Sequence, residues 1–79
     1  MKWWAIMQEI DTELAEAEAN FPAFHSTHEG IAVLREEYLE LETAVFGKQA
    51  TYDTAAMRAE AIQVATMAIR FIQDCLEGR

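Results

Sequence analysis

The sequence contains little cysteine, proline or glycine: Cys75 is the only cysteine, and one proline and three glycines occur in 79 residues. A single cysteine excludes a disulfide within the chain and is typical of a reduced thiol in a cytoplasmic protein. No apolar run approaches the roughly 18–20 residues that cross a membrane, and no basic segment followed by an apolar one indicates a signal peptide. We therefore expect one soluble cytoplasmic domain over residues 1–79.

Basic residues are also scarce, because six Lys and Arg stand against fourteen Asp and Glu, for a net charge of −8. This acidic excess opposes binding to nucleic-acid backbones and to anionic membrane surfaces. Hydrophobic residues make up 52% of the chain, which is too many for a disordered protein. A chain of this length buries only about 60–65% of its extended surface on folding. Its core therefore needs support from a metal or a partner chain.

The spacing of apolar residues predicts an all-α fold, an antiparallel bundle of three main helices. In the first helix apolar residues recur every three or four positions, and Glu9, Glu13 and Glu16 occupy the other side. Pro22 follows the end of this helix, because proline lacks an amide proton and disfavours helical geometry in the residue before it.

Capping signals mark the other two helices. Ser26 and Glu29 form a capping box at the start of the second helix, and Gly47 is a natural stop at its end. The expected helices are Trp3 to about Ala19, Ser26 to about Gly47, and Asp53 or Thr54 to about Leu76, with Lys48–Tyr52 as a short connection.

The third helix is apolar around most of its circumference. Thirteen of the twenty residues from Met57 to Leu76 are apolar, and they are not confined to one stripe. Such a helix needs cover on most sides, which two other short helices cannot easily provide. We expect a second copy of the chain to complete the bundle, in a homo-oligomer that is a dimer or a dimer of dimers.

Acidic residues lie beside the apolar stripes of the second and third helices. Glu37 and Glu40 share one helical face, and Glu60 and Gln63 have the same spacing. In an antiparallel hairpin that turns near residue 50, the two pairs lie at the same level. Three carboxylates and an amide oxygen would attract a hard cation such as Mg²⁺ or Mn²⁺. The alternative is that these acids lie on solvated helix edges.

Two stretches of the chain follow the pattern of a known family. They are HSTHEGIAVLREEYLELETAV (His25–Val45) and MRAEAIQVATMAIRFIQD (Met57–Asp74). The chain from Phe24 to Asp74 resembles the small all-α MazG-like nucleoside triphosphate pyrophosphohydrolases of bacteria and phages. The family has Glu-Glu-x-x-Glu on one helix and Glu-x-x-Asp on the next. Glu36, Glu37 and Glu40 match the first motif, and Glu60 begins the second, with Gln63 in the place of the aspartate.

The resemblance implies magnesium-dependent cleavage of (d)NTPs between the α- and β-phosphates, to a monophosphate and pyrophosphate. The biological setting would be housecleaning of the nucleotide pool or phage nucleotide metabolism. Glu37, Glu40, Glu60 and Gln63 would hold the metal, with one negative charge fewer than in the family pattern. Glu36 would position or deprotonate the attacking water; the alternative is a solvated residue paired with nearby side chains. The alternative function is a non-catalytic helical assembly or regulatory module that retains the scaffold.

Few side chains are available to bind the substrate's phosphates or base. His28, with His25 nearby, would lie near the mouth of the site, although histidines in capping loops are more often structural. Lys48, Arg58 and Arg70 are candidate phosphate clamps, since the chain has few cations. Each of these three is also a candidate for an ordinary surface ion pair.

Overall fold

The structure of this protein is a computed structural model that describes residues 2–47 and 53–78. Within these residues the chain folds into three α-helices. They are α1 (Trp3–Asn20), α2 (Thr27–Phe46) and α3 (Thr54–Phe71), and a π-helical segment, η1 (Ile72–Glu77), continues α3. No β-strand occurs within these residues, so the predicted all-α, three-helix fold is confirmed. The predicted connection over Lys48–Tyr52 lies outside the described residues.

Side-chain caps fix the starts of α2 and α3. The Ser26 hydroxyl accepts a hydrogen bond from the Glu29 N–H at 3.1 Å, as the capping box predicts. The Glu29 carboxylate reaches one residue further back than a capping box requires, because it accepts from the His25 N–H at 2.9 Å. Asp53, rather than Thr54, caps α3, since its carboxylate accepts from the Ala56 N–H at 3.0 Å. These contacts fix the residues at which α2 and α3 begin.

The last predicted helix changes its geometry near the C-terminus. The chain stays helical beyond Leu76, but the α-helix ends at Phe71 and a wider π-turn follows. Apolar spacing does not distinguish these two geometries over six residues. In this segment the Asp74 carboxylate accepts from the Phe24 N–H at 3.1 Å, and the Cys75 thiol donates to the Ser26 carbonyl at 3.4 Å. The π-turn therefore ties the end of the chain to the linker before α2.

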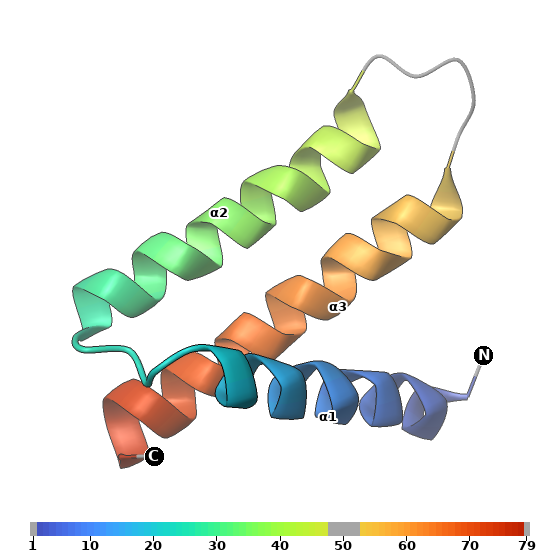
Figure 1. Ribbon diagram of the computed structural model, residues 1–79. Helices are drawn as coiled ribbons and strands as arrows, with labels where there is room; N and C mark the ends of the chain where they lie inside the picture. The colour runs from blue at the N-terminus through green and yellow to red at the C-terminus, as the bar shows by residue number, and fades with distance from the viewer. Residues whose placement is uncertain (1, 48–52, 79) are drawn as a thin grey trace.

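Helix α3 packs against both of the other helices (Figure 1). Helices α2 and α3 run antiparallel and side by side, while α1 packs on α3 and runs in the same general direction. Two side-chain contacts join α1 to α3: Glu9 contacts Arg58, 49 residues further along the chain, and Glu13 contacts Gln63, 50 residues further along. Because these two sequence separations differ by only one residue, α1 and α3 stay in the same register from one contact to the next.

The core is small and lies along α3. Its buried apolar side chains are Ile10, Phe24, Ile62 and Met67, and the Thr66 side chain is fully buried among them. Gly30 marks a close approach of α2 to Phe71 at the end of α3 and to Cys75 in η1. A Cβ at this position would lie 2.8 Å from Cδ2 of Phe71 and 3.0 Å from Sγ of Cys75. Glycine therefore lets the two helices meet without a side chain between them.

Much apolar surface stays exposed on this chain. The most exposed large side chains are Phe46 at 81% and Trp3 at 70%. Others are Trp4, Met7, Phe21, Ile31, Tyr38, Leu39, Val45, Ile72 and Leu76. Within residues 2–47 and 53–78, no helix combines the length and the apolar character that a membrane crossing requires.

Candidate functional site

Three glutamates from two helices converge at the middle of the α2–α3 hairpin. Glu37 and Glu40 come from successive turns of α2, and Glu60 faces them from α3. One carboxylate oxygen from each lies within 4.8 Å of the others. The antiparallel register brings these residues to one level, as the sequence predicted. This arrangement offers three oxygen ligands to one cation, which is the donor type that magnesium and manganese prefer.

The electrostatics of this cluster disfavour three bare negative charges. Burial raises the pKa of Glu37 above its usual range, and the charges of Glu40 and Glu60 raise it further. Burial also raises the pKa of Glu60, with a smaller contribution from Glu40. Both shifts have the sign expected for carboxylates that repel one another in a partly desolvated place. A divalent cation bound here would reverse the repulsion.

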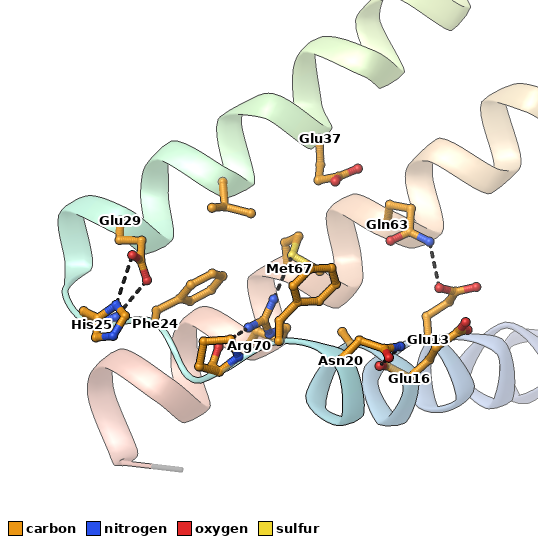
Figure 2. Close-up of a pocket in the computed structure, with 14 residues that line it drawn as sticks. Glu13, Glu16, Asn20, Phe24, His25, Glu29, Glu37, Gln63, Met67 and Arg70 are labelled. Atoms are coloured by element: carbon orange, nitrogen blue, oxygen red, sulfur yellow. Dashed lines mark hydrogen bonds and ion pairs between the residues drawn. The ribbon is translucent and has the colours of Figure 1, made fainter.

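Gln63 lies one turn beyond Glu60 on α3 and contacts α1. Its amide nitrogen donates to Oε2 of Glu13 at 2.8 Å. Figure 2 shows the amide oxygen on the side that faces Glu37, away from Glu13. The hydrogen bond to Glu13 fixes this orientation, because only the nitrogen of the amide can donate. Gln63 is thus oriented to offer a neutral oxygen on the side of the glutamates.

The acidic side of α1 was predicted only in part. The sequence indicated a polar face with Glu9, Glu13 and Glu16, but two of these residues contact α3. Glu9 forms a two-pronged ion pair with Arg58, and Glu13 is half-buried against Gln63. The spacing of apolar residues on α1 carried no signal for these contacts, because the partners lie about 50 positions away.

The remaining predicted site residues have separate environments. Glu36 is exposed on α2, next to Glu37, and its charge adds to the rise of that pKa. Arg58 is held by Glu9, so it is part of an ion pair between α3 and α1. His28 is exposed in the first turn of α2. Lys48 lies outside the described residues.

A pocket of about 630 Å³ adjoins the glutamate cluster (Figure 2). Residues from all three helices and from the linker between α1 and α2 line it, and Glu37 and Gln63 form part of its wall. Its volume lies within the range of about 300–1,000 Å³ that is usual for small-molecule sites. The pocket and the cluster therefore share the Glu37 side chain.

Arg70, a candidate phosphate clamp from the sequence, is a buried part of this pocket wall. Only 4% of the residue is exposed, and its guanidinium lies over the Phe24 ring at 4.3 Å. It donates to the Pro22 carbonyl at 3.0 Å and lies 3.8 Å from the Asp74 carboxylate. Its Nε is buried and has no hydrogen-bond acceptor within the described residues. The sequence did not indicate this set of contacts around the guanidinium.

Comparison with known protein families, with curated proteins and with solved structures gives no match to this chain.

The raised pKa of Glu37 leads to a testable effect of pH on stability. Because the folded-state pKa lies above the unfolded one, ionised Glu37 lowers stability at neutral pH, and this cost disappears below its ordinary value of 4.5. Glu37→Gln in chelator should therefore raise the free energy of unfolding by about 0.5 kcal/mol at pH 7, as for a relieved like-charge pair. The gain should vanish near pH 4. Urea melts of both proteins at the two pH values measure it, and a less stable variant at pH 7 would contradict it.

Proposed function

We propose that this protein is a magnesium-dependent nucleotide pyrophosphohydrolase, which cleaves (d)NTPs to (d)NMPs and pyrophosphate. The observation that carries the proposal is the convergence of Glu37, Glu40 and Glu60 from two helices. The resemblance of these residues to the MazG-like motif supports it, and so does the adjoining pocket. Acidic clusters of this kind suit chemistry on phosphates only when a cation joins them, because carboxylates repel phosphate oxygens.

The residues present fit a hard cation. Three carboxylates and the Gln63 amide oxygen would hold Mg²⁺, or Mn²⁺ in its place. The ion would neutralise phosphate charge and lower the pKa of bound water. Glu36 is exposed one position before Glu37, so it would orient the water or accept its proton. Nucleotide-pool housecleaning or phage nucleotide metabolism would be the setting, in the cytoplasm.

A direct assay tests this function. Pyrophosphate release is measured on a panel of ribo- and deoxyribonucleoside triphosphates, with millimolar magnesium and with chelator. We expect equal amounts of monophosphate and pyrophosphate from at least one nucleotide, and none in chelator. Release of orthophosphate instead would indicate cleavage at another bond. No turnover of any nucleotide would favour the alternative function, a non-catalytic assembly or regulatory module. The observation that favours this alternative is Gln63, which stands where the family pattern has a fourth carboxylate.

Gln63→Asp distinguishes a metal-facing position from a remote one. The added carboxylate would join a cluster whose pKa values are already raised, so the variant should be about 0.5–1 kcal/mol less stable than wild type in chelator. In millimolar magnesium it should be at least as stable, because the ion neutralises the extra charge. Thermal melts under both conditions show the crossover. If the stability difference between the variant and wild type is the same in chelator and in magnesium, Gln63 does not contact the metal.

We also propose that the chain forms a homo-oligomer, a dimer or a dimer of dimers. Exposed aromatic side chains such as Trp3 and Phe46 support this proposal. Light scattering at micromolar concentration should give at least twice the 9.0 kDa chain mass. Phe46→Ser should lower the mass if α2 forms the interface, and Glu18→Gln, an exposed position on α1, serves as the control. A compact monomer at all concentrations would contradict the proposal.

A further inference from the structure

Helix α2 carries an apolar stripe that the rest of the described chain leaves open. The α2 stripe consists of five residues at alternating intervals of three and four, Ile31, Leu34, Tyr38, Leu41 and Val45. Ile31, Tyr38 and Val45 are 54%, 52% and 43% exposed, and the two leucines are half-buried. Alternating intervals of three and four are the heptad pattern of a helix that packs lengthwise against another helix. The stripe therefore suits a partner helix that the described part of the chain does not supply.

The α2 stripe lies on the side of the hairpin that faces away from the pocket. Gly30 and Glu37 face α3, where Gly30 approaches the end of that helix and Glu37 meets its glutamate. Ile31 and Tyr38 each follow one of these residues, and one position turns an α-helix by about 100°. Glu29 precedes Gly30, so it lies on the other side of the line that faces α3, and it lines the pocket (Figure 2). The stripe and the pocket are thus on opposite sides of the α2–α3 hairpin.

Helix α3 extends this apolar surface with small side chains. Met67 lines the pocket, and Ala68, one position later, lies about 100° around the helix, past Phe71, which meets α2. The same step separates Val64 from Gln63, which also lines the pocket. Ala68 and Val64 are half-buried on the side of the α2 stripe. Because small side chains let a facing helix approach closely, the two helices together form one apolar face.

A second copy of the chain is the partner that fits this face. The α2 stripe spans about 21 Å at 1.5 Å per residue, which is about two heptads. A coiled coil that stands by itself needs at least about three or four heptads, so a single partner helix on α2 is too little. A second copy presents the same two-helix face, and two such hairpins stack as a four-helix bundle. Both helices of each hairpin then take part in the contact.

Charged residues at the edge of the α2 stripe favour a second copy in one orientation. Arg35 and Glu42 are exposed, and each follows a leucine of the stripe, on the edge away from α3. They lie seven residues apart, roughly 10 Å, so they do not pair with each other, and Arg35 forms no ion pair among the described residues. In an antiparallel pairing of two α2 helices, Tyr38 of each copy packs against Leu41 of the other. Arg35 then meets Glu42 of the other copy at both ends. A parallel pairing would instead place Glu42 beside Glu37 of the other copy, where like charges repel.

We propose that two copies of this chain pair through the α2 stripe and the adjoining face of α3, with the two α2 helices antiparallel. The twofold axis makes the contacts reciprocal, so Arg35 and Glu42 form two identical ion pairs across the interface. The pocket stays uncovered in each copy, because it lies on the opposite side of the hairpin. This interface rests on the homo-oligomer proposed above and is independent of nucleotide hydrolysis.

Reversing one charge at a time tests the interface. Arg35→Glu and Glu42→Arg each replace both ion pairs by like-charge pairs, so each variant alone should have at least about a tenfold higher dimer Kd than wild type. In an equimolar mixture of the two variants, opposite charges meet again at both ends, and the Kd of the mixed dimer should return to within about threefold of wild type. Glu18→Arg makes the same change of net charge at an exposed position of α1 and should leave the Kd unchanged. Sedimentation equilibrium measures each Kd, and circular dichroism shows whether each variant is folded.

The outcomes distinguish this interface from the oligomer itself. A dimer whose Kd changes in none of the variants would overturn this interface and leave the homo-oligomer in place, whereas a wild-type monomer at all concentrations would overturn both. Tighter association of Glu42→Arg alone is the result that a parallel pairing gives, through contact with Glu37, and it would contradict the antiparallel orientation. A mixture that does not recover would contradict the reciprocal ion pairs. The neutral change Glu42→Gln keeps an oxygen that accepts from Arg35, so it should leave the dimer intact.

Discussion

Asp74→Ala should strongly lower the free energy of unfolding at 25 °C. The Asp74 side chain is fully buried, accepts the Phe24 N–H, and lies 3.8 Å from the guanidinium of Arg70. Removing one partner of a buried ion pair costs about 3–5 kcal/mol, because the remaining charge is uncompensated. Small domains have only about 5–15 kcal/mol of total stability, and this chain buries few apolar side chains. Urea unfolding followed by circular dichroism measures the loss.

Two further variants identify the cause of that loss. Asp74→Asn keeps an oxygen that can accept from Phe24, so it should be more stable than Asp74→Ala while still lacking the charge. Arg70→Met combined with Asp74→Leu removes both charges and should recover stability relative to Asp74→Ala. A fully stable Asp74→Ala protein would mean that Arg70 is compensated by other groups.

On the proposed pyrophosphohydrolase function, Glu40→Gln should reduce magnesium-dependent pyrophosphate release by at least about 100-fold. The substitution preserves the size of the side chain but replaces one of three converging carboxylates. A metal supplies several kcal/mol of transition-state stabilisation, and each 1.36 kcal/mol is a factor of ten in rate. The matched control is Glu42→Gln, an exposed acid two positions further along α2, which should retain wild-type activity. Similar losses in both variants would indicate a general charge effect, and no loss in Glu40→Gln would place the cation elsewhere.

The hairpin part of the site could be predicted from the sequence because its geometry is local. Glu37 and Glu40 share a face through helical periodicity alone, and the antiparallel register places Glu60 opposite them. Capping chemistry likewise predicted the start of α2 at Ser26 and gave Asp53 or Thr54 for the start of α3, where the structure shows Asp53. These signals depend on a few neighbouring residues, so they can be read without knowing the tertiary structure.

The contacts of α1 and of the C-terminus could not be predicted in the same way. The partnership of Glu13 with Gln63 depends on how α1 packs on α3, and the burial of Arg70 depends on the linker residues Pro22 and Phe24 that contact it. Periodicity identifies an apolar face but gives neither a crossing angle nor a register between helices. The π-turn at Ile72–Glu77 was missed for the same reason, since its contacts with Phe24 and Ser26 are tertiary.

The fixed separation of about 50 residues between α1 and α3 has a consequence for the order of folding. Glu9 meets Arg58 and Glu13 meets Gln63 only after a chain segment of that length has closed, which costs more entropy than closing the α2–α3 hairpin. Contacts between residues close in sequence form faster than distant ones. We therefore expect α2 and α3 to pair first and α1 to dock last. The glutamate cluster would then exist in a folding intermediate before the pocket has its α1 wall.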